Sequence, residues 1–286
     1  MSETAPLSAA DPRPARVGFT VPPQHASIAE IRRTVATLEE LGADLLFTWD
    51  HFFPLSGDLD GRHYECWTIL GAWAEATERV EIGALVTSNS YRNPNLLADM
   101  ARTVDHLSGG RLVLGIGAGW TQRDYDEYGY DFGTAGSRLD DLARDLPVIR
   151  DRWTRLNPPP TREIPILIGG GGERKTLRIA AEHATIWHGF GDQHVIAHKH
   201  RVLDDWCARR GRDPLEIERA AGVAFVPGRH PDQRADYPGN AQLLHDIGTR
   251  LFTASMSAVD PDLGRARDLL QWRDEVNARR DLATGS

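Results

Sequence analysis

Residues 164–189 read IPILIGGGGERKTLRIAAEHATIWHG. A short apolar run at 164–169 is followed by four glycines that open a helical pattern, and a second apolar run follows at 185–189. Continuous apolar runs of this length, rather than alternating ones, are typical of parallel strands that are covered by helices on both faces. The stretch therefore predicts a strand–helix–strand unit of an α/β fold.

The same alternation of apolar runs and helical patterns continues along almost the whole chain. The expected strands are residues 17–21, 45–49, 80–86, 112–118, 164–169, 185–189, 217–226 and 250–257. Helix signals lie between them, among them a capping box formed by Ser27 and Glu30 and a proline-started helix at Asn93–Pro94. Eight such units predict a (β/α)8 TIM barrel, and a doubly wound sheet is the alternative because strand order cannot be read from one sequence.

The domain organisation follows from this count. Residues 17–279 are expected to form a single catalytic barrel, with a disordered N-terminal tail at 1–16 and a short C-terminal tail at 280–286. Residues 227–239, rich in Pro, Gly and Asp, are expected to be a loop at the mouth of the barrel. The helical spacing at 139–156 and the Asp260–Pro261 start predict two further helices.

Composition limits the class of protein. The 286 residues are 41% hydrophobic and 26% charged, which is typical of a globular protein rather than a disordered or fibrous chain. The net charge of −8 argues against nucleic acid or an anionic membrane as the partner. No run approaches the ~18 apolar residues of a membrane span, and residues 1–16 lack the apolar core of a signal peptide. Cys66 and Cys207 form no CxxC motif, so a soluble cytoplasmic protein is expected.

Chemistry in such a barrel is expected where strands end, because the loops that follow them converge there. Four strand ends carry polar or glycine-rich segments: TWDHF at 48–52, TSNSYRNP at 87–94, GIGAGW at 115–120 and GGGGERK at 169–175. Adjacent Asp50 and His51 are suited to bind a polar ring edge and to move protons. The alternative is that Asp50 caps the following turn and His51 is an ordinary half-buried histidine.

The glycine-rich segments predict close approach by a ligand. The alternating glycines of GIGAGW suit a flat ligand, or else they mark a barrel corner; Trp120 breaks the GxGxxG dinucleotide fingerprint. The four glycines at 169–172 leave backbone N–H groups free at a helix start, which predicts a phosphate pocket. His194 and His198 lie one helical turn apart, but without further ligands a solvated helix is the better interpretation and no metal is expected.

The order of these motifs resembles the luciferase-like flavin and deazaflavin oxidoreductases, most closely the members that use coenzyme F420. The resemblance is carried by TWDHF, GALVTSNSYRNP at 83–94, HLSGGRLVLGIGAGW at 106–120 and PILIGGGGERKTLRIAAEHA at 165–184. It covers about residues 16–205 and becomes loose beyond them. It implies a TIM barrel with a flavin-like ring at the C-terminal mouth.

The resemblance also implies roles for single residues. Leu85 and Val86 match a bulge that in many members contains a cis peptide and supports the ring. Asp50 matches the residue that binds the polar edge of the ring, and His51 matches an acid/base residue. The other cofactor-binding positions implied are Ser88, Ala118 and Gly119 near the ring, Gly170, Gly171 and Gly172 in the phosphate loop, and Arg174, with Lys175, toward the charged tail.

One position departs from the family pattern. Sugar-phosphate dehydrogenases of the family carry a glutamate where this chain has Trp120, which argues against sugar-phosphate oxidation. Together with Trp49, Phe52 and Tyr64, Trp120 predicts an aromatic, apolar substrate pocket, the alternative being packing at the barrel rim.

The predicted function is therefore hydride transfer between C5 of F420 and a small organic substrate, with Asp50 fixing the ring and His51 moving the accompanying proton. An FMN-dependent monooxygenase using reduced flavin and O2 is the first alternative. A non-catalytic cofactor carrier or sensor is the second, and a TIM-barrel lyase or hydrolase that binds a phosphorylated substrate is the third. Family habit implies a homodimer, and no nucleic-acid or membrane partner is expected.

Overall fold

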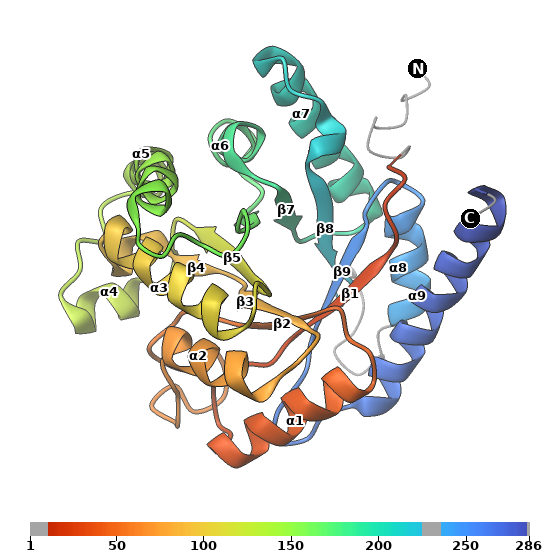
Figure 1. Cartoon of the computed structure of the whole chain (residues 1–286), viewed down its shortest axis with the longest axis horizontal. Coiled ribbons are helices and arrows are strands. Elements are labelled where there is room, and N and C mark those ends of the chain that lie inside the picture. Colours follow the sequence, from red (N-terminus) through yellow and green to blue (C-terminus); the bar gives the residue numbers. More distant parts are fainter. Residues whose placement is uncertain (1–10, 225–235, 285–286) are drawn as a thin grey trace.

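A closed ring of parallel strands forms the centre of the molecule (Figure 1). The computed structural model describes residues 11–224 and 236–284. Its strands are β1 (Arg16–Thr20), β2 (Leu45–Thr48), β3 (Glu81–Ala84), β4 (Thr87–Ser88), β5 (Leu112–Gly117), β6 (Ile166–Gly169), β7 (Ile186–Gly189), β8 (Glu218–Gly222) and β9 (Leu251–Ser255). They neighbour one another in the order β3, β2, β1, β9, β8, β7, β6, β5, β4, and the pairing of β3 with β5 closes the ring.

Strands β3 and β4 both pair with β5 and are two halves of one barrel strand, interrupted at residues 85–86. The described residues thus contain eight barrel strands, and every pairing between them is parallel. The predicted (β/α)8 barrel is confirmed, and the doubly wound alternative is wrong.

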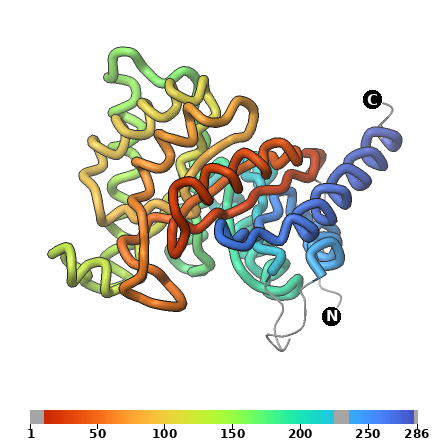
Figure 2. The backbone as a smooth tube through the Cα atoms, turned by 90° about the horizontal axis from the view of Figure 1, so that it is seen from below, coloured from red at the N-terminus to blue at the C-terminus, as the bar shows by residue number. Residues whose placement is uncertain are grey.

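Helices surround the barrel (Figures 1 and 2). They are α1 (Ile28–Glu40), α2 (Cys66–Ala76), α3 (Pro94–Leu107), α4 (Gln122–Tyr128), α5 (Ala135–Arg155), α6 (Thr176–His183), α7 (Gln193–Arg210), α8 (Tyr237–His245) and α9 (Leu263–Thr284), with 3-10 turns η2 (Asn89–Tyr91) and η3 (Pro214–Glu216). The predicted capping box is present: Ser27 Oγ accepts from the Glu30 N–H, and the Glu30 carboxylate accepts from the Ser27 N–H. The Asn93 side chain caps α3 by accepting from the Asn95 N–H, ahead of Pro94.

The interior of the barrel is filled by side chains, so the cylinder is a packed core rather than a pore. Its buried residues are Leu45, Phe47, Val113, Leu167, Ile186, Ala220 and Leu251. Leu85 and Val86 pack on this cluster from the C-terminal end of the strands. These two residues therefore separate the core from whatever lies at the mouth.

Several predicted boundaries differ from the structure. Residues 237–239 belong to α8 rather than to the predicted loop at 227–239, because Asp236 caps that helix by accepting from the Gly239 N–H. The rest of that loop, apart from Asp236, and the end of the predicted strand 217–226 lie outside the described residues.

The two chain ends also depart from the predicted tails. Arg16 is already part of β1, and Asn277 of α9 accepts a hydrogen bond from the Ala15 N–H at 2.8 Å. Helix α9 continues past residue 279 to Thr284 and packs on α8, at the dark blue end of the tube in Figure 2. Residues 11–16 are thus part of the folded body, and residues 280–284 extend α9, with Leu282 85% exposed, whereas residues 1–10 lie outside the described residues.

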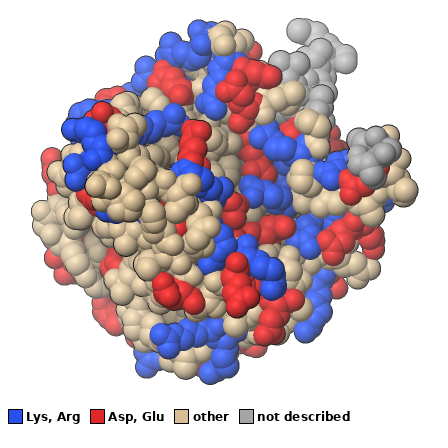
Figure 3. All heavy atoms as spheres, viewed as in Figure 1, with Lys and Arg blue, Asp and Glu red and all other residues tan. Residues whose placement is uncertain are grey.

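The surface carries both signs of charge. On the face shown in Figure 3, basic and acidic side chains are interspersed. Among the described helices, none combines the length and the apolar character that crossing a bilayer requires.

Candidate active site

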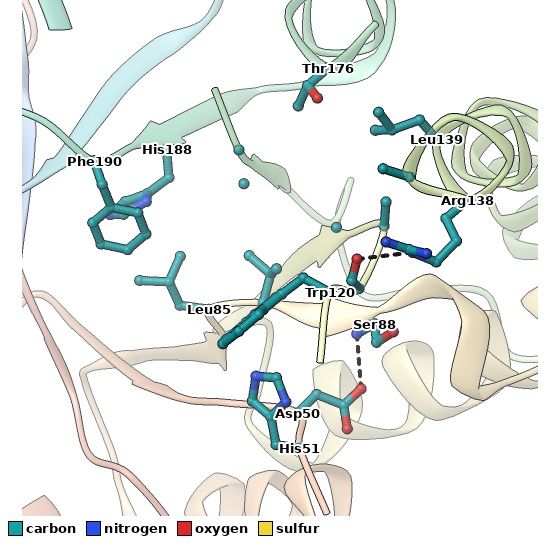
Figure 4. Close-up of a pocket in the computed structure, with 17 residues that line it drawn as sticks. Asp50, His51, Leu85, Ser88, Trp120, Arg138, Leu139, Thr176, His188 and Phe190 are labelled. Carbon is teal, nitrogen blue, oxygen red and sulfur yellow. Dashed lines mark hydrogen bonds between the residues drawn. The ribbon is translucent and has the colours of Figure 1, made fainter. Parts of the chain in front are cut away.

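A cavity of about 370 Å³ opens at the C-terminal ends of strands β2 to β7 (Figure 4). Nine residues predicted from the sequence line it: Asp50, His51, Leu85, Val86, Ser88, Ala118, Gly119, Trp120 and Gly170. Eight residues not predicted as site residues also line it: Gly117, Ala135, Arg138, Leu139, Gly169, Thr176, His188 and Phe190. Its volume lies within the range of small-molecule and cofactor sites.

The floor of the cavity is the bulge at Leu85–Val86, whose peptide bond is cis, as the family resemblance implied. The Val86 side chain covers two glycines of the neighbouring strands. A Cβ on Gly117 or on Gly169 would lie 2.8 Å from a Val86 methyl group. Glycine at these positions therefore makes room for the bulge.

The alternating glycines at 115–119 make room for the protein's own packing. Gly117 and Gly119 also line the cavity, so the close approach of a flat ligand stays a prediction. A Cβ on Gly115 would lie 1.8 Å from the Ala84 carbonyl oxygen. Gly119 has a φ of +75°, and a Cβ there would lie 2.1 Å from the Tyr125 hydroxyl. The alternative interpretation, glycine at a barrel corner, agrees with these contacts.

Asp50 lies buried at the edge of the cavity, with both carboxylate oxygens occupied. Its Oδ2 accepts from the Ser88 N–H at 3.0 Å, and Arg92 donates to both oxygens at 2.6 and 3.0 Å. Burial raises the pKa of Asp50, and the Arg92 guanidinium opposes that rise. Arg92 also pairs with Glu65, so Asp50 anchors the loop after β4 as well as lining the cavity. Its binding to a ring edge stays a prediction.

His51 projects toward the cavity (Figure 4), and its ring is held by a hydrogen bond to Asp124 of α4. Its Nδ1 lies 2.7 Å from Asp124 Oδ2, so Nε2 is the ring nitrogen that faces a ligand. The sequence analysis missed Asp124. Helix α4 spans only seven residues with no apolar spacing, so no pattern singled it out.

Arg138 of α5 was also missed and lines the cavity opposite His188 and Phe190 (Figure 4). It is 7% exposed, donates to the carbonyls of Gly119 and Phe132, and stacks on the Phe132 ring. Among the described residues, no carboxylate pairs with it. The sequence carried a signal: Arg138 precedes the buried Leu142 by one turn, which puts a charge on the buried face of the helix.

The glycine loop after β6 contributes less than predicted. Gly170 lines the cavity with a φ of +127°, and its N–H donates to the His188 carbonyl at 3.0 Å. Gly171, Gly172 and Arg174 are exposed and do not line the cavity, because the chain turns outward after Gly170. Thr176, the first residue of α6, brings the chain back to the cavity wall.

Of the four predicted substrate-pocket aromatics, only Trp120 lines the cavity, where it is 66% exposed. Trp49 lies beside His51 and donates from Nε1 to His63 Nε2 at 3.1 Å. Phe52 stacks on Tyr128 at 3.8 Å, and Tyr64 packs against the core.

Phe190, which was not predicted, is the other exposed aromatic side chain among the described residues that line the cavity. A second histidine, His188, lies next to it. Its Nε2 lies 2.7 Å from the Thr253 hydroxyl, and burial lowers its pKa to about 3. His188 is therefore neutral at physiological pH.

The histidines considered as metal ligands lie elsewhere. His198 Nε2 is 3.1 Å from a carboxylate oxygen of Glu173, on the exposed side of α7. Within residues 11–224 and 236–284, no three His, Cys, Asp or Glu side chains are grouped to hold a metal ion.

Comparisons with known proteins agree with this architecture. A family model described as luciferase-like monooxygenase matches residues 13–275. A Mycobacterium tuberculosis protein provisionally named a coenzyme F420-dependent oxidoreductase is 28% identical over 246 residues, which is 74% of this chain and 65% of that protein. An F420-dependent glucose-6-phosphate dehydrogenase of Microbacterium testaceum is 26% identical over 239 residues, 77% of this chain and 70% of its own. The chain thus spans about two thirds of the length of these relatives.

A solved structure has the same fold. An F420-dependent secondary alcohol dehydrogenase in complex with an F420–acetone adduct superposes with a TM-score of 0.77, covering 92% of this chain and 98% of that one. At 16% sequence identity, the likeness is one of fold.

Proposed function

The chain belongs to the luciferase-like monooxygenase family, and from that premise we propose that it is an oxidoreductase that transfers a hydride between coenzyme F420 and a small organic substrate. The names of the two bacterial relatives support this choice of cofactor. When bound, F420 supplies the carbon that accepts or donates the hydride. The protein's part is to bind, orient and move a proton.

The cavity fits a planar cofactor with an anionic tail. The Leu85–Val86 bulge offers an apolar floor for the ring, and Arg138 lies at the wall beside Leu139 (Figure 4). The observation that carries the proposal is the buried Arg138 guanidinium, which has no carboxylate partner among the described residues. A phosphate group would satisfy this cation, and the Gly170 and Thr176 segment would complete its surroundings.

The substrate side of the cavity is aromatic. Trp120 and Phe190 are both 66% exposed there, as expected of side chains that a ligand covers. By the family resemblance, Trp120 also stands where the sugar-phosphate dehydrogenases carry a glutamate. A small substrate with an apolar body therefore fits better than a sugar phosphate, with His51 handling the proton.

A cofactor titration tests the proposal. The purified chain is mixed separately with F420 and with FMN, and quenching of cofactor fluorescence gives each Kd. We expect F420 to bind more tightly by about tenfold or more. A panel of small apolar alcohols, ketones and enones then shows whether the bound cofactor changes its oxidation state.

Each other outcome has a defined meaning. Tighter binding of FMN, with oxygen consumption by the reduced form, would replace this function by an FMN-dependent monooxygenase. Binding of F420 without turnover of any substrate in a broad panel would favour a carrier or sensor. Binding of a sugar phosphate without either cofactor would favour a lyase or hydrolase.

A further inference from the structure

Asp124 is a buried acid that contacts His51 from helix α4. It is fully buried, and its carboxylate accepts three hydrogen bonds. Oδ2 accepts from His51 Nδ1 at 2.7 Å and from the Tyr91 hydroxyl at 2.9 Å, and Oδ1 accepts from the Phe52 N–H at 3.0 Å. One side chain of α4 thus fixes the loop after β2 and the turn η2.

The charge of Asp124 follows from these contacts. Burial alone would raise the pKa of Asp124, but the hydrogen bonds from His51, Phe52 and Tyr91 outweigh it, so the pKa lies below its ordinary value. Asp124 is therefore an anion at neutral pH. An anionic acceptor keeps the proton of a neutral imidazole on the nitrogen that faces it, here Nδ1.

The surroundings also restrict the ring of His51. Trp49 and Trp120 meet it edge to face, with ring centroids 6.1 and 5.7 Å away. Because Nδ1 is bonded to Asp124 and the two tryptophans flank the ring, Nε2 points into the cavity (Figure 4).

We propose that Asp124 is the positioning residue of a proton-handling pair: it holds His51 with Nε2 toward the substrate and stabilises the imidazolium that forms during turnover. The inference rests on the proposed function. For an alcohol substrate, a bound deazaflavin would supply the acceptor for the hydride that leaves as the C–H bond breaks. The hydroxyl proton passes to Nε2 as the C=O double bond forms, so the substrate is oxidised by two electrons and the cofactor is reduced. In the reverse direction, Nε2 returns the proton.

The other histidine of the cavity lacks this support. His188 contacts the Thr253 hydroxyl rather than a carboxylate, at 2.7 Å. Within the described part of the chain, no anion lies within salt-bridge distance of its ring. A positive charge on His188 would be uncompensated, so the pair of His51 and Asp124 is the site for the proton.

The test replaces Asp124 by Asn, which keeps the shape and removes the charge. Tyr91→Phe is the matched control, because it removes another donor to the same oxygen and leaves His51 its partner. The first readout needs no cofactor: 15N NMR of the His51 ring shows which nitrogen carries the proton. We expect Nδ1–H in the wild type and in Tyr91→Phe, and a shift toward Nε2–H in Asp124→Asn, since an amide can donate to Nδ1.

The second readout is turnover with a substrate from the panel. Asp124→Asn should lower kcat by about 10²- to 10⁴-fold, as when a triad aspartate is replaced by asparagine, while KM and the Kd of F420 change less than about threefold. Asp124→Glu retains the charge and should recover much of the lost rate.

Several results would overturn the inference. A wild-type His51 with its proton on Nε2 does so without any variant, even if Asp124→Asn fails to fold. In Asp124→Asn, the inference is also overturned if His51 keeps its proton on Nδ1 or if kcat stays within about twofold of the wild type. Absence of F420 binding to the wild type overturns the proposed function instead and leaves the NMR result to decide whether Asp124 positions His51.

Discussion

Arg138 shows how one residue can reveal a missing partner. Two other arginines, whose side chains are 0% and 9% exposed, have carboxylates beside them: Arg219 lies 2.6 Å from Asp204, and Arg92 lies 2.6 Å from Asp50. Arg138 has backbone carbonyls instead. An unpaired buried charge costs on the order of several kcal/mol, so an anionic ligand at this wall would lower the free energy of the whole site.

Replacement of Arg138 by Ala should therefore weaken F420 binding. Loss of a charge-assisted hydrogen bond of about 1.5–3 kcal/mol corresponds to a Kd raised by about 10- to 150-fold. A deazaflavin that lacks the phosphate-bearing tail should bind the variant and the wild type alike. Fluorescence titration measures both ligands.

The control for this variant is Arg155→Ala, at the exposed end of the same helix, where the side chain is 58% exposed. It should leave both Kd values unchanged. If Arg138→Ala raises the Kd of both ligands equally, the arginine shapes the cavity rather than binding the tail.

At the scale of elements, the interrupted strand and its neighbours are fitted to one another. Val86, between β3 and β4, sits against Gly117 at the end of β5 and Gly169 at the end of β6. Gly169→Ala should destabilise the chain by about 1–3 kcal/mol, because its Cβ would lie 2.8 Å from a Val86 methyl group in a packed region. Urea unfolding gives the free energy.

A double-mutant cycle tests that cause. Val86→Ala removes the obstructing methyl groups, so Gly169→Ala combined with Val86→Ala should be less destabilised than the sum of the single variants, by about 1 kcal/mol or more. If the effects of Gly169→Ala and Val86→Ala on the free energy of unfolding add strictly, this explanation is contradicted.

Gly71→Ala in the middle of α2, where a Cβ meets open space, should instead stabilise the chain by about 0.5–1 kcal/mol.

Elements with a strong local sequence pattern were predicted, whereas the short, polar helix α4 was not. The capping box at Ser27 and the apolar runs of the strands are local signals, and they predicted α1 and the barrel strands. Helix α4, with the sequence QRDYDEY, has no apolar spacing, so the helix and Asp124 were both missed. Its position depends on contacts with His51 and Phe52, which are distant in sequence.

At the scale of the whole molecule, closure of the barrel decides which predicted residues meet. The ends of β2 to β7 converge, so Asp50 and His51, expected from the strand ends, lie with Leu85 and Val86, which the family resemblance implied. Arg138, which a helix supplies, was not predicted, and the turn after Gly170 places Gly171, Gly172 and Arg174 outside the cavity lining. The reason is that the path of a loop between strand and helix depends on tertiary packing, which one sequence does not encode locally.

The folded chain as a whole also buries histidines in neutral form. Burial lowers the pKa of His188 and of His200 to about 3 and that of His63 to about 4, from an ordinary value of 6.5. Below pH 6.5 the unfolded chain takes up protons at these positions and the folded chain does not. Burial raises the pKa of Asp50, so Asp50 acts in the opposite direction.

Stability should consequently fall on mild acidification. Each of the three histidines contributes a loss of up to about 1.4 kcal/mol per pH unit once the pH is below 6.5. Urea unfolding at several values from about pH 7 to about pH 5 measures the slope. His200→Gln should make the slope shallower, whereas His194→Gln, on the exposed side of the same helix, should leave it as it is because that side chain stays in water. A free energy of unfolding that stays flat over this range would contradict the burial of neutral histidines as a source of acid sensitivity.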